Sequence, residues 1–334
     1  MLVHILWFAL GLVLLIKGGD WFVDGATGIA KKFHVPDLLI GATVVSIGTT
    51  LPEVMVSATS AVQGHGAMAY GNAIGSIICN TALIAALTVA IKPCKTERKS
   101  LIVPVIFFFA AAAIYSGVAY FSGYFSRPIG IILLAIFVLY MIILIRQAIN
   151  PSKSVETVEE EPEQEEKKNK LKDKMWMILL MLVVGAALIA WGANLLVNHG
   201  TAIAEGLGVP ETVIALTFVA LGTSLPELVT AITSLAKGHG ALSLGNICGA
   251  NLFNLVLVSG LSITLGPFRF DSSQFSTMTI GGKEYFSSLI IDTPLMLLVM
   301  AILTIPALCK QKLSRWQGIL LLCMYAGFCI FQFV

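Results

Sequence analysis

Charged residues are scarce in this chain. Of its 334 residues, only 12% are Asp, Glu, Lys or Arg, whereas 57% are hydrophobic. About a quarter of the residues in soluble globular domains are charged, so this composition leaves too little polar surface for a soluble protein of this size. We therefore predict an all-α protein embedded in a lipid bilayer, and we expect no nucleic-acid partner.

Motifs for metal binding, disulfides and catalysis are also missing. The six cysteines form no CxxC pair and no zinc spacing, and most lie in apolar segments, so we interpret them as small buried side chains. There is no HExxH motif and no repeated Asp dyad, and the histidines are assigned to loops. These absences disfavour an intramembrane hydrolase, so we expect neither an enzyme nor a bound cofactor.

Long apolar runs are what the sequence has in abundance. A helix needs roughly 20 residues to cross about 30 Å of hydrocarbon. The first run has no basic segment before it and no small-residue cleavage site after it, so we interpret it as a membrane helix rather than a signal peptide. We predict ten membrane helices, at about 2–26, 36–62, 67–91, 101–121, 128–147, 175–198, 209–235, 241–266, 286–308 and 315–333.

The basic residues are distributed unevenly between the predicted loops. If the N-terminus is outside, 17 of the 21 Lys and Arg residues fall in cytoplasmic loops, three fall outside and Lys17 lies in the first helix. The positive-inside rule then predicts a multi-pass protein of the cell membrane with both termini outside. The segment 149–174 has a Glu-rich block followed by a Lys-rich block, and we expect it to be a solvated cytoplasmic linker.

One polar motif occurs twice. Ser46–Glu53 reads SIGTTLPE, and 174 residues later Ala220–Glu227 reads ALGTSLPE. The match at this offset extends to the segments 71–80 and 245–254. It also pairs Asp20 with Asn194, Asp24 with Asn198, and the turn Gln63-Gly64-His65-Gly66 with Lys237-Gly238-His239-Gly240.

The duplication divides the chain into two halves, 1–148 and 175–334, in which the most similar parts are 36–91 and 209–266. Each half has five predicted helices, so equivalent helices run in opposite directions across the membrane. This is an inverted-topology repeat, a plan on which many secondary transporters build a site near the bilayer midplane.

The repeated residues supply oxygen atoms of the kind that hard cations prefer. Thr49 and Glu53 are four apart and share a helix face, as do Thr223 and Glu227. A carboxylate inside an apolar segment is costly, and a proline there frees a backbone carbonyl that needs a partner. No His or Cys lies at the repeated ligand-type positions. This chemistry favours Ca²⁺, with Na⁺ or H⁺ competing for the same two glutamates, as an antiporter requires.

The doubled motif resembles a motif pair of a known transporter family. The sequences Gly-Thr-Thr-Leu-Pro-Glu and Gly-Thr-Ser-Leu-Pro-Glu, each followed by a Gly-Asn…Asn segment, resemble the two α-repeats of the sodium/calcium exchanger family. The resemblance covers essentially the whole chain. It implies exchange of Ca²⁺ for Na⁺ by alternating access, with the first and sixth helices as the sliding pair. We expect a single copy to be functional.

The resemblance also implies a cluster of four ion sites. The central Ca²⁺ site maps onto Glu53, Glu227, Thr49 and Thr223. One flanking Na⁺ site maps onto the Ser46 carbonyl, Thr49, Ser76 and Glu227, and the other onto the Ala220 carbonyl, Thr223, Glu53 and position 250. A middle site maps onto Glu53, Glu227, Asn80 and Asn254, and Thr50 and Ser224 occupy neighbouring hydroxyl positions.

This chain departs from the family pattern at three places. Position 250 is Ala where a serine hydroxyl is usual, Ile77 replaces an asparagine, and neither position 80 nor position 254 is an aspartate. These departures leave the Ca²⁺ ligands in place but weaken the expectation for Na⁺. Two alternatives therefore remain: a Ca²⁺/H⁺ exchanger that uses the same two glutamates, and a passive cation channel.

Overall fold

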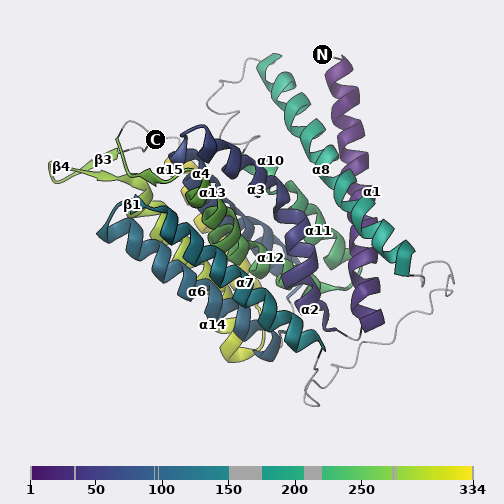
Figure 1. Ribbon diagram of the computed structural model, residues 1–334. Coiled ribbons are helices and arrows are strands. Elements are labelled where there is room, and N and C mark those ends of the chain that lie inside the picture. The colour runs from purple at the N-terminus through teal and green to yellow at the C-terminus, as the bar shows by residue number, and fades with distance from the viewer. Residues whose placement is uncertain are drawn as a thin grey trace.

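The computed structural model describes residues 2–33, 35–93, 95–96, 98–149, 175–206, 220–272, 275 and 277–332. Within these ranges the protein is a bundle of long helices with four short strands (Figure 1). Eight helical runs are long and apolar enough to cross a membrane, and two apolar helices, Leu225–Ala236 and Arg315–Phe331, are shorter. The prediction of a multi-pass, helical membrane protein is confirmed.

The first part of the chain contains five helical runs. The first is α1 (Leu2–Phe33). The second run consists of α2, η1 and α3, and the third of α4, η2 and α5. The segments η1 and η2 are short π-helices, which are wider than an α-helix. The remaining elements are α2 (Asp37–Ile40), η1 (Gly41–Val45), α3 (Ser46–Val62), α4 (Gly66–Cys79), η2 (Asn80–Ala85), α5 (Ala86–Ile91), α6 (Arg98–Phe121), the strand β1 (Tyr124–Phe125) and α7 (Arg127–Ile149).

The second part begins with the long helix α8 (Met175–Gly206). It continues with α10 (Ala220–Thr223), α11 (Leu225–Ala236), α12 (Gly240–Phe253), η4 (Asn254–Val258), α13 (Ser259–Leu265), the strands β2 (Phe268–Arg269), β3 (Thr277–Ile280) and β4 (Lys283–Phe286), η5 (Ser288–Asp292), α14 (Thr293–Lys310) and α15 (Arg315–Gln332). Part of the seventh predicted helix, 209–219, lies outside the described residues.

The helix ends lie close to the predicted ones, except in the first and sixth helices. α1 continues to Phe33 instead of ending near residue 26, and α8 continues to Gly206 instead of ending near 198. The predicted ends followed the loss of apolar residues. A helix leaving the hydrocarbon can continue through polar residues such as Lys31 and Lys32, because water solvates them there.

α1 and α8 form a closely packed pair at one side of the bundle, as Figure 1 shows. A Cβ atom added to Gly18 would lie 2.9 Å from the Gly185 carbonyl oxygen, and one added to Gly185 would lie 2.5 Å from the Phe22 backbone nitrogen. Only glycine allows the two backbones to approach this closely, a common device between membrane helices. Outside this contact the helix pair lies at the periphery of the bundle. Only 19% of the most apolar part of α1 is buried, whereas 83% of the most apolar part of the span Gly240–Leu265 is buried.

Strand pairings join the two parts of the chain at both ends of the bundle. At one end β1 pairs with β2 in antiparallel register, Tyr124 with Arg269 and Phe125 with Phe268, and an aromatic cluster around Tyr70 packs beneath this pair. A single bridge joins Lys95 to Lys312, between the loops that precede α6 and α15. The predicted excursion 267–285 also contains the β3–β4 hairpin, which apolar periodicity did not reveal.

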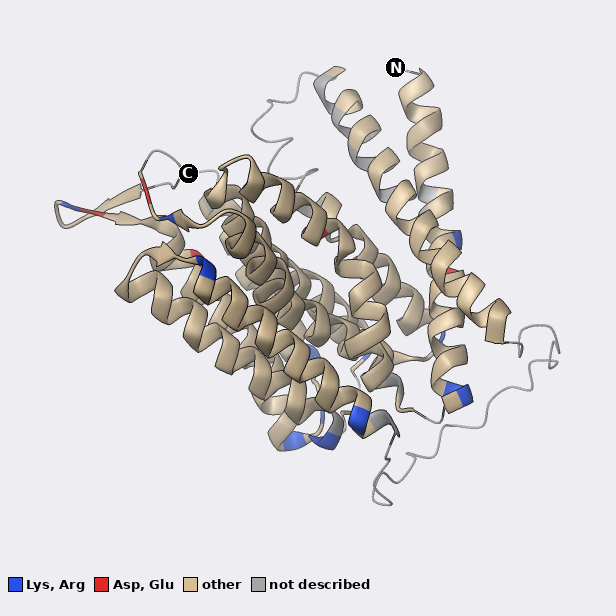
Figure 2. Ribbon diagram, viewed as in Figure 1, with Lys and Arg blue, Asp and Glu red and all other residues tan. Residues whose placement is uncertain are grey.

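The charged residues follow the pattern expected for a membrane bundle. Figure 2 shows few charges along the middle of the helices and most Lys and Arg at one end. The two ends of the chain lie at the opposite end of the bundle (Figures 1 and 2).

Two minor predictions are wrong. His4 and His199 lie in α1 and α8 rather than in loops, with their Nδ1 atoms 3.0 Å apart. Cys79 and Cys248 are buried as predicted, but Cys309 and Cys323 are exposed. An exposed apolar side chain is stable on the outer face of a membrane bundle because lipid is as apolar as the protein core.

Candidate functional site

The two copies of the repeated motif bring their glutamates into the protein interior through different backbones. Pro52 lies inside the continuous helix α3, where it cannot donate to the carbonyl one turn earlier. In the second copy the helix breaks at Ser224, and Pro226 lies in the first turn of α11, where its missing N–H costs nothing. In both copies the proline therefore has no N–H to offer to the carbonyl four residues earlier.

Glu53 and Glu227 are both completely buried. None of their four carboxylate oxygens has a hydrogen-bond partner within the described part of the chain. The two side chains are close enough to interact electrostatically, and Glu227 faces the hydroxyls of Thr49 and Thr50 on α3. A buried, unpaired carboxylate is costly, and two neighbouring ones are more so, unless a cation compensates them.

Neutral oxygen ligands accompany the two carboxylates. Asn80 and Asn254 are completely buried, and neither amide has a partner among the described residues. The hydroxyls of Thr50, Thr223 and Ser224 also lack a partner there. Of the 15 unpartnered buried polar side-chain atoms in the described residues, 11 belong to these five residues and the two glutamates. Buried polar groups in proteins are almost always paired, so this concentration indicates a ligand site.

The helix geometry at the two asparagines is the same. The π-helical segment η2 begins at Asn80 and η4 begins at Asn254, and both residues have φ −58° and ψ −38°. π-helical segments inside α-helices occur frequently at functional sites. η2 packs against α11, which carries Glu227, and η4 packs against α3, which carries Glu53. Each asparagine segment therefore lies against the glutamate helix of the other half.

The remaining predicted site residues have different surroundings. The Ser46 hydroxyl lies 2.7 Å from the Gly41 carbonyl oxygen and 2.9 Å from the Asn246 carbonyl oxygen, so its single proton is committed to these carbonyls. Thr49 Oγ1 donates to Asn246 Oδ1 at 3.2 Å, which commits the hydroxyl proton and leaves the oxygen lone pairs available. Ser76 is buried, and Ala220 is the first residue of α10.

Sequence reasoning missed two supporting asparagines that are also 174 residues apart. Besides accepting from Thr49, Asn246 donates to Thr230 Oγ1 at 2.9 Å. Asn72 donates to Ser57 Oγ at 2.8 Å and to the Glu53 carbonyl at 3.4 Å. Both asparagines fix the helix that carries a glutamate. Their repetition in the Gly-Asn pairs was a visible signal, but their partners depend on how the helices pack.

A small crevice lies between the α1–α8 pair and the two motif prolines. Its lining includes Phe22 of α1, Ile189 of α8, Thr49, Pro52 and Pro226. The volume of about 10 Å³ suits about one water molecule. Apolar side chains from the helix pair therefore lie beside a ligand-type hydroxyl and both motif prolines.

The fold and the site together define a membrane protein with a cluster of buried, unpartnered carboxylate, amide and hydroxyl groups among its described residues. The family model described as sodium/calcium exchanger protein matches residues 3–146 and 177–334. The chain therefore belongs to the sodium/calcium exchanger family.

Individual relatives match along almost their whole length. The uncharacterized membrane protein MJ0091 of Methanocaldococcus jannaschii is 33% identical, and the match covers 96% of this chain and 94% of the relative. The sodium/calcium exchanger MaX1 of Methanosarcina acetivorans is 30% identical, with 99% of both chains covered. A solved structure of the sodium-calcium exchanger NCX_Mj is similar with a TM-score of 0.75, 31% identity and 97% of both chains covered.

Proposed function

We propose that this protein is a secondary active antiporter that exchanges Ca²⁺ for Na⁺ across the cell membrane by alternating access. The observation that carries the proposal is the pair of buried carboxylates, Glu53 and Glu227, whose oxygens have no hydrogen-bond partner among the described residues of a sodium/calcium exchanger family member. Ca²⁺ and Na⁺ are its transported substrates. No chemical reaction is assigned to the site.

The charge of the site suits competition between these ions. Two carboxylates balance one Ca²⁺ or about two Na⁺, and Ca²⁺ accepts six to eight oxygens in adaptable geometry. We assign Glu53, Glu227, Thr49 and Thr223 to Ca²⁺, and Asn80 and Asn254 to the middle of the cluster. Ions that share ligands exclude one another, so binding of Na⁺ from one side promotes release of Ca²⁺ on the other.

The Na⁺ ligands differ between the two halves. We assign the Ser46 carbonyl, Thr49, Ser76 and Glu227 to one Na⁺ site. The opposite site uses the Ala220 carbonyl, Thr223 and Glu53, but residue 250 is a completely buried alanine and offers no hydroxyl. Thr50 and Ser224 contribute neighbouring hydroxyls. The Na⁺ site beside Ala250 is therefore the weaker of the two.

We also propose ten membrane helices arranged as two inverted five-helix repeats, 1–148 and 175–334, joined by the linker 149–174. The equivalent turns support this, since Gly64 and Gly238 have φ values of +83° and +84°, a conformation that favours glycine. The loop links support it too. β1, between α6 and α7, pairs with β2, which follows α13, and Lys312, between α14 and α15, pairs with Lys95, which follows α5. These pairings are equivalent under exchange of the halves.

The proposed orientation places both termini outside and the linker in the cytoplasm. Its support is the gathering of Lys and Arg at the end of the bundle away from the chain termini (Figure 2). Because one chain supplies carboxylates, amides and hydroxyls from both halves, a single copy is expected to transport ions.

Measurement of ⁴⁵Ca²⁺ uptake into Na⁺-loaded proteoliposomes tests the proposed function. We expect uptake that follows the imposed Na⁺ gradient and is unaffected by a pH gradient. Uptake driven by pH alone would identify a Ca²⁺/H⁺ exchanger and overturn the proposal. Unitary Ca²⁺ currents in bilayer recordings would identify a channel.

A further inference from the structure

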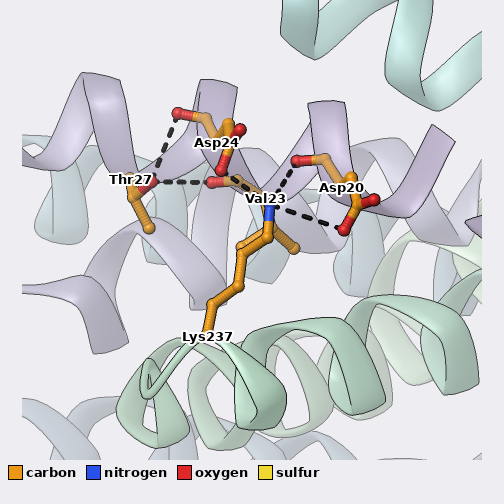
Figure 3. A network of polar contacts seen from close by, with 5 residues as sticks. All are labelled: Asp20, Val23, Asp24, Thr27 and Lys237. Carbon is orange, nitrogen blue, oxygen red and sulfur yellow. Dashed lines mark hydrogen bonds and ion pairs between the residues drawn. The ribbon is translucent and has the colours of Figure 1, made fainter. Parts of the chain in front are cut away.

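A charged network links α1 to the end of α11. Lys237 ends α11, and its Nζ lies 2.7 Å from Asp24 Oδ1, 3.6 Å from Asp20 Oδ1 and 2.9 Å from the Asp20 carbonyl oxygen. Thr27 Oγ1 donates to the Val23 carbonyl at 2.9 Å one turn further along α1 (Figure 3). The lysine thus joins the peripheral α1–α8 pair to the helix that carries Glu227.

The equivalent positions of the other half carry no charge. At the 174-residue offset, Asp20 corresponds to Asn194, Asp24 to Asn198 and Lys237 to Gln63. Asn198 donates to Asn194 at 2.8 Å, so these two amides bond to each other within α8. The charged network therefore exists in one half only, although most of the ion-binding residues are shared by both.

The position of the network suits control of a sliding motion. α1 is tightly packed on α8 through Gly18 and Gly185. It also packs on α11, where a Cβ atom added to Gly19 would lie 2.6 Å from Val229 Cγ1. Displacing α1 along its axis by one helical turn, about 5.4 Å, would leave only one of the two aspartates beside Lys237, because Asp20 and Asp24 are themselves one turn apart. The full network, with both aspartates at Lys237, can form only while α1 is in its present position relative to α11.

We propose that Lys237, Asp20 and Asp24 are positioning residues that form a one-sided latch, favouring the state in which the α1–α8 pair closes the core at the Lys237 end. This inference rests on the proposed exchange by alternating access. The latch reduces the fraction of molecules open at the Lys237 face. It thereby weakens the apparent affinity for ions arriving from that face, because apparent affinity scales with the competent fraction.

The expected size of the effect is modest. The three side chains are 28%, 39% and 31% exposed, for Lys237, Asp20 and Asp24 respectively, so water screens their attraction. A partly exposed network of this kind shifts an equilibrium by about fivefold, which corresponds to about 1 kcal/mol.

The test uses the full chain in vesicles of known orientation, with the KM for Ca²⁺ measured separately from each face during Na⁺-driven exchange. For Lys237→Gln, and for Asp20→Asn with Asp24→Asn, we expect the KM at the Lys237 face to fall by up to about fivefold while the KM at the opposite face does not fall. Lys237→Arg keeps the charge and should retain wild-type values. Lys310→Gln removes an exposed lysine at the end of α14 and serves as the control.

A charge reversal, Lys237→Asp with Asp24→Lys, should restore the wild-type ratio of the two KM values if the contact itself is responsible. Unchanged ratios in the neutral variants, or equal changes at both faces, would overturn the latch while leaving exchange intact. If the wild-type protein shows no Na⁺-driven Ca²⁺ exchange, the proposed function fails and the latch fails with it. If Lys237→Gln does not fold, the Asn double variant and the charge reversal decide the question.

Discussion

Replacing Glu53 by Gln separates the cost of the buried carboxylate from its contribution to ion binding. The substitution keeps the shape of the side chain and removes one of two charges from a site in which all four carboxylate oxygens lack a partner among the described residues. Removing one partner of a buried pair of opposite charges, here a carboxylate that binds Ca²⁺, typically costs about 3–5 kcal/mol. We therefore expect Ca²⁺ affinity to fall by about two to four orders of magnitude and transport to be lost.

The same variant should behave in the opposite way without Ca²⁺. A neutral amide removes the repulsion between Glu53 and Glu227 and the cost of burying a charge, so the ion-free variant should be at least as stable as the wild type. At a Ca²⁺ concentration of 100 times Kd the wild type gains about 2.7 kcal/mol from binding, and the variant gains almost nothing.

Thermal unfolding in detergent, followed by tryptophan fluorescence with and without Ca²⁺, gives both quantities, and ⁴⁵Ca²⁺ flux gives the transport rate. Glu284→Gln, on the exposed hairpin strand β4, is the matched control and should retain the Ca²⁺-dependent rise in Tm. A Glu53→Gln protein that is still stabilised by Ca²⁺ and still transports it would refute the assignment of Glu53 as a ligand.

Three further substitutions test the supporting structure. Ala250→Ser should restore a hydroxyl at the weaker Na⁺ site and lower the Na⁺ concentration for half-maximal exchange; an unchanged value would mean that position 250 does not face an ion. Asn246→Ala should leave the Thr49 hydroxyl without its acceptor and cost about 1–3 kcal/mol in denaturant unfolding, together with weaker Ca²⁺ binding by titration calorimetry. Gly18→Ala should lower Tm and slow exchange because its Cβ meets α8 at 2.9 Å, whereas Gly117→Ala, with open space around it among the described residues, should leave both nearly unchanged.

The positions of most helices and of the two glutamates could be predicted because they depend on short stretches of sequence. Apolar runs gave the approximate ends of most helices, since a membrane helix must satisfy its own backbone hydrogen bonds. The doubled motif singled out Glu53 and Glu227 because a carboxylate in such a run needs a strong reason to be there. Both residues are completely buried in the structure.

The features that sequence reasoning missed depend on contacts between distant segments. The π-helical segments at Asn80 and Asn254 have no signature in hydrophobic periodicity, and the bond between Asn246 and Thr49 joins residues 197 positions apart. The break at Ser224 is another example. Its counterpart Thr50 lies in an unbroken helix, so the repeat itself predicted the wrong backbone for one of the two copies.

The differences between the halves are as informative as the similarities. In an inverted repeat with identical halves, the outward-open and inward-open states would have equal energies, because exchange of the halves converts one state into the other. Any preference for one state must therefore arise from positions where the halves differ. Here the differences include three that the structure places, namely Ser224 against Thr50, Ala250 against Ser76, and the Lys237 network against its neutral counterparts. The first two lie among the candidate ion ligands and change the energy of binding. The third lies outside that cluster, so it can set which face is open without altering the ion ligands.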